Sequence, residues 1–227
     1  NTYLYLAETG IGQEKVFEKL KEINDRISKS GVMLISGEYG SGKTTVLKRI
    51  IDRFGSRSII GGKKIIYYNC NQSEKSIEFE RLLINAGGFF RRLFGIKKKN
   101  MILLLDEAQD ANKKDMKEVI RYYNDGFFRS VVLVSKKEDM ALPKDLDDII
   151  GSNKFSFDRI SREEAIKLLR KRIGNLKFIS DDIIAKIFRK NNNPRAFLKN
   201  CEDVCRHAYE SGSKEVTEKH IKILNKK

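Results

Sequence analysis

The sequence predicts an α/β fold in which a parallel five-stranded sheet lies between two layers of helices and is followed by a small all-helical domain. Two observations predict it. Up to residue 157, short apolar runs alternate with amphipathic stretches, which is typical of buried parallel strands joined by helices. Beyond that point only helical periodicity continues. We therefore expect an α/β core over residues 1–158 and a helical lid domain over residues 159–227.

The expected elements of the core follow in chain order. The first is a helix over residues 13–28, because Val16, Leu20, Ile23 and Ile27 recur at spacings of three and four. Four expected strands are apolar runs and span residues 32–35, 65–68, 101–105 and 131–134, and a short fifth strand is expected over residues 154–157. The helices expected between them span residues 44–54, 76–93 with a break at Gly87-Gly88, and 113–123.

The expected lid domain consists of four helices. They span residues 161–173, 180–190, 193–209 and 217–224. Ser161 with Glu164 has the spacing of a capping box, in which two side chains satisfy the first backbone N–H groups of a helix. Asn193 before Pro194 places a capping residue ahead of a proline at the first helical position.

The segment after the first strand, GEYGSGKTT, contains the pattern Gly-x4-Gly-Lys-Thr. A strand before this pattern and a helix after it are the context of a P-loop, whose backbone N–H groups converge on phosphates. The pattern predicts that Lys43 reaches the β- and γ-phosphates of ATP and that the Thr44 hydroxyl coordinates Mg²⁺. The residues expected to line the nucleotide are Gly37, Glu38, Tyr39, Gly40, Ser41, Gly42, Lys43, Thr44 and Thr45.

Asp106 and Glu107 follow five apolar residues at the end of the third expected strand. Ligands of open α/β sheets bind outside the carboxyl ends of the strands, so both carboxylates are expected to face the phosphates. Asp106 is then the expected partner of Mg²⁺ beside Thr44, and Glu107 the base that polarises a water for attack on the γ-phosphate. The pair favours Mg²⁺-dependent hydrolysis of ATP to ADP and phosphate over transfer to a small-molecule hydroxyl.

Over nearly its whole length the chain resembles the AAA+ ATPases, through its P-loop, its Asp-Glu strand end and its helical domain with Asn193-Pro194-Arg195. The segments DEAQD and NNNPRAF resemble the origin-recognition and initiator clade and the related transposition and secretion ATPases. The resemblance implies that Ser135 is a sensor of the γ-phosphate or the attacking water. It implies that Arg195 is a second sensor, which reaches the γ-phosphate from the lid.

The resemblance also implies an arginine finger supplied by a neighbouring subunit, and here the sequence departs from the family. No arginine stands between residues 142 and 158. Lys154, Arg159 and Arg129 are the nearest candidates, and none matches well. Either hydrolysis is slow and switch-like, or the finger comes from elsewhere.

Net charge is +15, and residues 160–227 hold 17 Lys/Arg against 9 Asp/Glu. A basic field of this kind attracts the phosphate backbone of nucleic acids. Lys167, Arg170 and Lys171 form a basic face on the first lid helix and are the candidate DNA contacts; a solvated surface is the alternative. For Arg91-Arg92 and residues 97–99, the sequence favours a solvated loop over phosphate contact.

No apolar run approaches the roughly 20 residues that span a bilayer, and the three cysteines form no disulfide framework pattern. A reduced, cytoplasmic protein without a membrane span is therefore expected. The predicted function is an ATPase acting on DNA in replication initiation, helicase loading or transposition regulation, with nucleotide-dependent assembly into a homo-oligomer. The alternative is a signalling or protein-remodelling switch that never touches nucleic acid.

Overall fold

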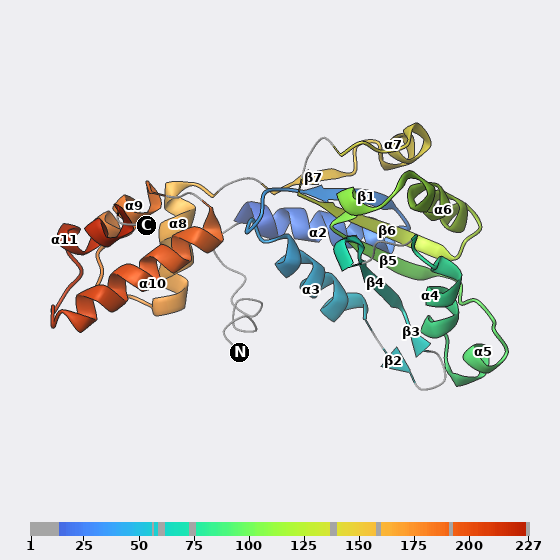
Figure 1. Cartoon of the computed structure of the whole chain (residues 1–227), viewed down its shortest axis with the longest axis horizontal. Coiled ribbons are helices and arrows are strands. Elements are labelled where there is room, and N and C mark those ends of the chain that lie inside the picture. Colours follow the sequence, from blue (N-terminus) through green and yellow to red (C-terminus); the bar gives the residue numbers. More distant parts are fainter. Residues whose placement is uncertain are drawn as a thin grey trace. The chain divides into compact units, whose positions relative to one another are not determined.

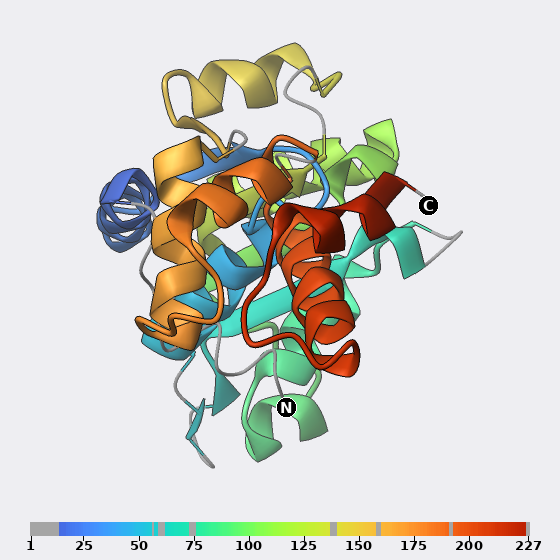
Figure 2. The same cartoon turned by 90° about the vertical axis from the view of Figure 1, so that its left-hand side faces the viewer.

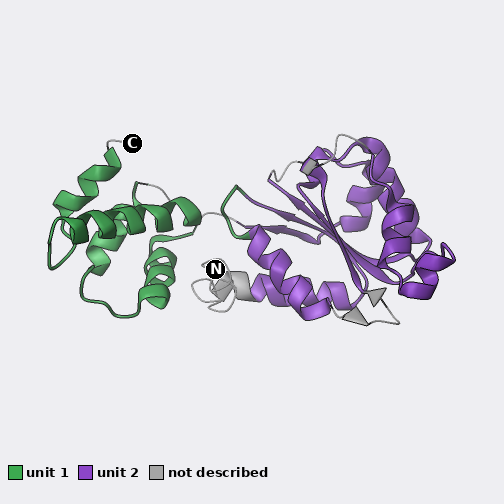
Figure 3. Cartoon of the chain, turned by 60° about the horizontal axis from the view of Figure 1, so that its bottom comes forward, with its two compact units in different colours: residues 1–17, 38–42, 158–227 green, residues 18–37, 43–157 purple. Residues whose placement is uncertain are grey.

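A computed structural model describes residues 14–55, 57–58, 62–72, 76–136, 140–157, 160–190 and 193–225 of the chain. These residues fall into two compact units, coloured separately in Figure 3. Unit 2 comprises residues 18–37 and 43–157, and unit 1 comprises residues 1–17, 38–42 and 158–227.

Unit 2 is built on a parallel five-stranded sheet in the order β4-β5-β6-β1-β7 (Figure 1). The strands are β1 Val32–Ser36, β4 Ile65–Asn69, β5 Met101–Asp106, β6 Phe128–Ser135 and β7 Lys154–Ser156. Every residue of β1 and the first five of β5 are buried, as expected of central strands covered on both faces. The sheet confirms the predicted α/β fold with five parallel strands.

Helices cover both faces of this sheet (Figures 1 and 3). On one side lie α4 Phe79–Ala86, α6 Lys113–Asn124 and α7 Lys144–Ile150, whose buried residues join the cluster around β5. On the other side lie α2 Glu14–Ser28 and α3 Lys43–Phe54. Alternation along β6 divides its side chains between the faces: Val131 and Leu133 belong to the first cluster, whereas the Ser130 hydroxyl donates to the Ile27 carbonyl of α2 at 2.8 Å.

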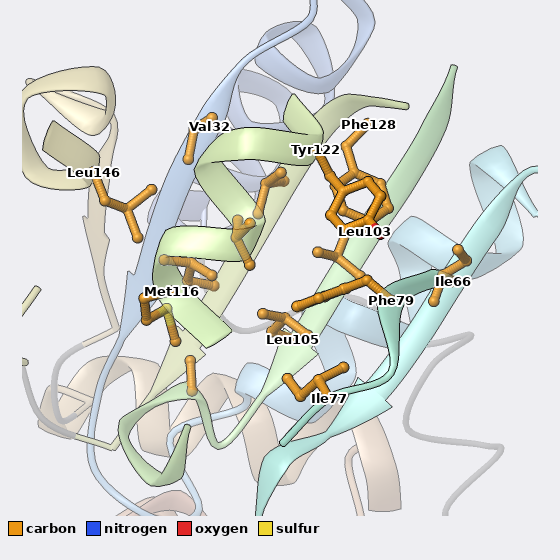
Figure 4. Packing of buried hydrophobic residues seen from close by; sticks show 14 of the residues in the cluster. Val32, Ile66, Ile77, Phe79, Leu103, Leu105, Met116, Tyr122, Phe128 and Leu146 are labelled. Atoms are coloured by element: carbon orange, nitrogen blue, oxygen red, sulfur yellow. The ribbon is translucent and has the colours of Figure 1, made fainter. Parts of the chain in front are cut away.

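Aromatic rings fill the end of the main core, where α4 and α6 meet the sheet (Figure 4). The ring centroids of Phe79, Tyr122 and Phe128 are 5.8 and 5.9 Å apart, with the rings tilted or edge to face. Such arrangements place ring edges against ring faces, which their quadrupoles favour. Leu103 and Leu105 of β5 continue this core toward the carboxyl end of the strand.

The helix predicted over residues 76–93 starts later than expected, at Phe79, whereas the predicted break at Gly87-Gly88 is present and separates α4 from α5 Phe89–Leu93. It starts late because the Ile77 amide donates to the Asp115 carboxylate at 2.9 Å, which ties the preceding residues to α6 instead. The hairpin of β2 Arg57–Ser58 and β3 Gly62–Lys63, the helix α7, and the 3-10 turns η1 Cys70–Gln72 and η2 Ala108–Asp110 were not predicted. Elements this short carry little periodicity.

The remaining helices, drawn in orange to red in Figure 2, belong to unit 1, and their buried residues form a second core. They are α8 Arg162–Ile173, α9 Asp181–Phe188, α10 Pro194–Glu210, α11 Glu218–Ile221 and the 3-10 turn η3 Lys222–Asn225. Both predicted caps are present. The Ser161 hydroxyl accepts from the Glu164 amide at 3.2 Å, and the Asn193 side chain accepts from the Arg195 amide at 3.1 Å. Cys201 is a free thiol in this core, and burial raises its pKa to about 12.

Leu103→Ala tests how far the stability of unit 2 depends on the centre of β5. Leu103 is fully buried, so truncation leaves a cavity, and we expect the free energy of unfolding to fall by about 2–5 kcal/mol. Urea denaturation followed by circular dichroism measures this. Leu176→Ala, at a side chain that is 56% exposed, is the control and should change stability by about 0.5 kcal/mol or less. Equal effects of the two changes would contradict the packing described for β5.

Candidate active site

The P-loop runs from the end of β1 to Lys43, the first residue of α3. Gly37, Gly40 and Gly42 have φ values of 150°, 84° and 105°, a region that side chains disfavour. The Lys43 ammonium donates a hydrogen bond to the Gly37 carbonyl, so the loop closes around a lysine that is only 9% exposed. Burial lowers the pKa of Lys43, and the nearby carboxylates of Glu107 and Asp106 partly offset this effect.

The strand order gathers the predicted site residues of unit 2 at one edge of the sheet. Because β6 pairs in parallel with both β1 and β5, the carboxyl ends of these three strands point the same way. Ser36 pairs with Ser135, and Leu105 pairs with Leu133. Ser135 therefore ends its strand between the P-loop on one side and Asp106-Glu107 on the other.

Asp106 accepts two hydrogen bonds. The Tyr67 hydroxyl of the neighbouring strand β4 donates to Oδ2 at 3.0 Å, and the Glu107 amide donates to Oδ1 at 3.0 Å. Burial, together with this hydrogen bond to Asp106, raises the pKa of Tyr67. Tyr67 thereby fixes the carboxylate at the strand end. Sequence reasoning missed this role, because a tyrosine in an expected strand favours a core or edge position.

Glu107 lies in the left-handed region, with φ of 52°, which is uncommon for a residue other than glycine. Its Oε2 atom accepts from the side-chain Nε2 of Gln109 at 2.8 Å and lies 3.3 Å from the Lys136 ammonium. The backbone amide of Lys136 in turn donates to Gln109 Oε1 at 3.2 Å. Gln109 and Lys136 were not predicted as site residues, although one stands in DEAQD and the other follows Ser135.

Two features of the P-loop fit a phosphate chain and Mg²⁺. Ser41 Oγ is buried and has no hydrogen-bond partner in the described part of the chain, which suits a hydroxyl that donates to a phosphate oxygen. Thr44 is exposed in the first turn of α3, where its hydroxyl can meet a cation. Among the described residues no three His, Cys, Asp or Glu cluster as a metal cage. Mg²⁺ commonly binds through one or two protein oxygens, phosphates and water, so this donor set suits it.

Within unit 1, the P-loop residues Tyr39 and Gly40 contact the start of α10. Arg195 donates from Nη1 to the Tyr39 hydroxyl at 2.5 Å, and its guanidinium lies 5.2 Å from the centre of the Tyr39 ring. The Asn193 side-chain amide donates to the Tyr39 carbonyl. A Cβ at Gly40 would lie 2.5 Å from Asn193 Oδ1, so this contact requires glycine. Arg195 therefore lies beside the P-loop segment.

The candidate DNA contacts on α8 differ from one another. Arg170 is engaged inside the unit, because its guanidinium bonds Asp181 at 2.7 Å, the Leu176 carbonyl at 3.0 Å and the Ile179 carbonyl at 2.7 Å. These bonds hold the loop between α8 and α9. Lys167 and Lys171 are exposed and remain candidates for contact with a ligand.

The arginine-finger candidates are also engaged where the structure describes them. Arg129 donates to the Ser28 carbonyl at 2.7 Å, which ties β6 to the end of α2. Lys154 pairs with Asp147 at 2.8 Å. Arg159 lies outside the described residues.

A family model described as an AAA domain matches residues 29–150, which is more than half of the chain. The fold is similar to that of Cdc6p from Pyrobaculum aerophilum, with a TM-score of 0.67, 16% identity, and coverage of 94% of this chain and 66% of that one. It is similar to the Orc1 protein of Aeropyrum pernix in complex with DNA, with a TM-score of 0.66, 14% identity and coverages of 93% and 65%.

The RuvB Holliday junction branch migration motor of Thermotoga maritima is also similar, with a TM-score of 0.69, 18% identity and coverages of 95% and 69%. The chain thus spans about two-thirds of the length of these three proteins. No curated protein matches the sequence. None of the described helices combines the length and apolar character that crossing a bilayer requires.

Gly40→Ala tests the contact between the P-loop and the start of α10. The new methyl group meets Asn193 and also occupies a positive φ of 84°, so two costs add. Gly212→Ala is the matched control in the same unit, because Gly212 has φ of 71° and a Cβ there would meet nothing within 4 Å. Urea denaturation should show a loss of about 1–2 kcal/mol for the control, from the backbone alone. If Gly40→Ala lowered the free energy of unfolding by no more than Gly212→Ala does, the contact between Gly40 and Asn193 would be contradicted.

Proposed function

Because the chain belongs to the AAA domain family and has the AAA+ fold, we propose that it binds ATP with Mg²⁺ at the P-loop and hydrolyses the γ-phosphate. The observation that supports this most is the meeting of Lys43, Ser135 and the Asp106-Glu107 pair at one edge of the sheet. A cation, a hydroxyl and two carboxylates at a P-loop are the groups that phosphoryl transfer to water requires.

In this proposal the P-loop holds the phosphates and the buried lysine neutralises them. The Lys43 ammonium exchanges its hydrogen bond to the Gly37 carbonyl for oxygens of the β- and γ-phosphates. Thr44 and Asp106 would hold Mg²⁺, which would supply further positive charge to the phosphates, and the Tyr67 hydroxyl keeps Asp106 oriented. The Ser41 hydroxyl gains the partner that it lacks in the described structure.

Glu107 is the proposed base that takes a proton from the attacking water. Gln109 holds the carboxylate, and the Lys136 ammonium, 3.3 Å from Glu107, is proposed to stabilise the charge that develops on the γ-phosphate. Ser135, at the end of β6, is proposed to contact the γ-phosphate or the water. Arg195, beside Tyr39, is proposed to sense the γ-phosphate and so to link nucleotide state to the helical residues of unit 1.

Glu107→Gln tests hydrolysis separately from binding. The amide keeps the size of the side chain but cannot accept a proton, so we expect ATP turnover to fall about 10²–10⁴-fold while ATP affinity is kept. Asp110→Asn is the matched control, because Asp110 is an exposed carboxylate three residues away that also contacts Gln109, at 3.4 Å. Phosphate release and fluorescent-ATP titration measure the two quantities. If Glu107→Gln turned over ATP as fast as the wild-type chain, Glu107 would not be the base.

The proposed target is DNA, in a process of the initiation, helicase-loading or transposition-regulating kind, with nucleotide-dependent self-association. Support comes from the net charge of +15 and from the similar folds of an Orc1 protein solved with DNA and a branch migration motor. ATP binding would increase the affinity for DNA, and hydrolysis would lower it again.

Charge reversal on α8 tests this target. We expect Lys167→Glu with Lys171→Glu to weaken DNA binding. The slope of log affinity against log salt concentration should become shallower by about 0.9 for each phosphate contact that is lost. Lys214→Glu with Lys219→Glu, also exposed in unit 1, should change both less. Fluorescence anisotropy with a non-hydrolysable ATP analogue at several salt concentrations measures this. No DNA binding by the wild-type chain in any nucleotide state would instead favour the switch that recognises a protein partner.

A further inference from the structure

Helix α5 and the residues after it expose a group of large apolar side chains on unit 2. Five of them are between 51% and 69% exposed: Phe89, Phe90, Leu93, Phe94 and Ile96. Phe89 and Leu93, like Phe90 and Phe94, are four residues apart in a helical segment, so they share one face. We name residues 89–99 the α5 patch. A contiguous exposed apolar surface of this kind marks an interaction site more often than an isolated exposed leucine does.

The same patch is strongly basic. Arg91 and Arg92 lie between the apolar residues, and Lys97, Lys98 and Lys99 follow them, whereas no Asp or Glu occurs from residue 81 to residue 105. Burial lowers the pKa of Lys98, and the positive charges of Arg91 and Lys64 lower it further. Some of the charge is used locally, since Lys97 lies 3.2 Å from Glu80. An anionic partner would relieve the remaining repulsion.

Backbone hydrogen bonds fix the shape of the patch. The Ile96 amide donates to the Arg91 carbonyl at 2.8 Å, and the Lys98 amide donates to the Leu83 carbonyl of α4 at 3.3 Å. Lys97 and Lys99 lie 5.6 and 5.2 Å from the centre of the Phe127 ring. The apolar side chains are therefore presented from an ordered segment at the periphery of unit 2, next to α4 (Figure 1).

The patch lies away from the candidate active site. Residues 97–100 lead into the amino end of β5, whereas Asp106 and Glu107 stand at the carboxyl end of the same strand. A partner bound at the patch would leave the P-loop edge of the sheet open. The patch therefore calls for a ligand other than the nucleotide.

We propose that the α5 patch docks the protein on an anionic lipid surface, with the phenylalanines, Leu93 and Ile96 entering the outer acyl region and the cations contacting headgroup phosphates. From residue 86 to residue 99 the chain contains only Ala, Gly, Phe, Leu, Ile, Lys and Arg. Such a segment offers hydrocarbon and positive charge, the two features that interfacial membrane binding uses.

Other occupants match this composition less well. Nucleic acid would use the cations and could stack its bases on the phenylalanines, but the aliphatic Leu93 and Ile96 cannot stack on bases, and the segment has no amide or hydroxyl side chain to bond base edges. A second copy of the same patch would bring like charges together. A protein partner would also suit the phenylalanines and arginines, which are enriched at protein interfaces, but it would meet three consecutive lysines, a residue type depleted there, and no Tyr or Trp between residues 86 and 99.

Vesicle co-sedimentation of the full chain tests the proposal. We expect binding to vesicles that contain phosphatidylglycerol and not to vesicles of phosphatidylcholine alone, and we expect this binding to weaken as salt rises. Leu93→Ser with Phe94→Ser should lower the vesicle affinity by about tenfold or more, because acyl contact is lost. Tyr209→Ser with Leu176→Ser is the matched control: these side chains are 78% and 56% exposed on unit 1, and the change should leave vesicle binding unaltered.

Arg92→Glu with Lys99→Glu tests the contribution of the positive charges, since both side chains are exposed. This double change should abolish the preference for vesicles that contain phosphatidylglycerol over vesicles of phosphatidylcholine alone. ATP turnover, measured on every variant without lipid, should stay unchanged, so failure of this proposal is distinguishable from failure of the ATPase proposal. Vesicle binding that survives Leu93→Ser with Phe94→Ser would overturn the proposal. So would loss of single-stranded DNA binding or of a lipid-free oligomer in that variant, which would assign the patch to nucleic acid or to a second copy.

Discussion

The candidate site depends on the parallel pairing of β6 with β1 on one side and with β5 on the other. The carboxyl ends of parallel strands lie at the same edge of a sheet. The pairing register of β6 with β1 and β5 therefore places Ser36, Ser135 and the residues after Leu105 side by side at that edge. Slippage by one residue would turn every side chain of the slipped strand to the other face. Since β1 and β6 are almost wholly buried, such a change would expose core residues, and the register is strongly fixed.

The same strand pairing brings the positive charge of Lys43 close to the negative charges of Asp106 and Glu107. Lys43 is buried and its pKa is lowered, a state in which an ammonium is poorly solvated, and the carboxylates of Glu107 and Asp106 act against that loss. Glu107 adopts a left-handed backbone that costs about 1–2 kcal/mol for a residue with a side chain. Its bonds to Gln109 and Lys136 hold it there. Strain retained beside a buried lysine is typical of a functional site rather than of a structural turn.

The sheet, most helices and two helix caps were predictable because each has a local signal: apolar runs for buried strands, three- and four-residue spacing for helices, and Ser161 or Asn193 at a helix start. The positions of Lys43, Asp106 and Glu107 were predictable from motifs. Tyr67, Gln109 and Lys136 were not, because their contacts depend on which strands are neighbours, and strand order leaves no mark in a short sequence window. The engagement of Arg170 by two backbone carbonyls was missed for another reason: they lie in the loop between α8 and α9, whose conformation has no periodic signal in the sequence.

Strand β5 also sets how the two proposed sites can influence each other. It has six residues, and five steps of about 3.3 Å place its end residues about 17 Å apart. That separation is about twice the distance over which salt screens exposed charges in physiological conditions. Direct attraction or repulsion between a phosphate at the P-loop and the cations of the α5 patch is therefore weak. Any coupling between lipid binding and ATP turnover would have to pass through movement of β5, which is packed on both faces by residues that are fully or almost fully buried. Independent binding at the two ends of the strand is thus the expected behaviour, and measured coupling would mean that unit 2 has a second arrangement of this strand.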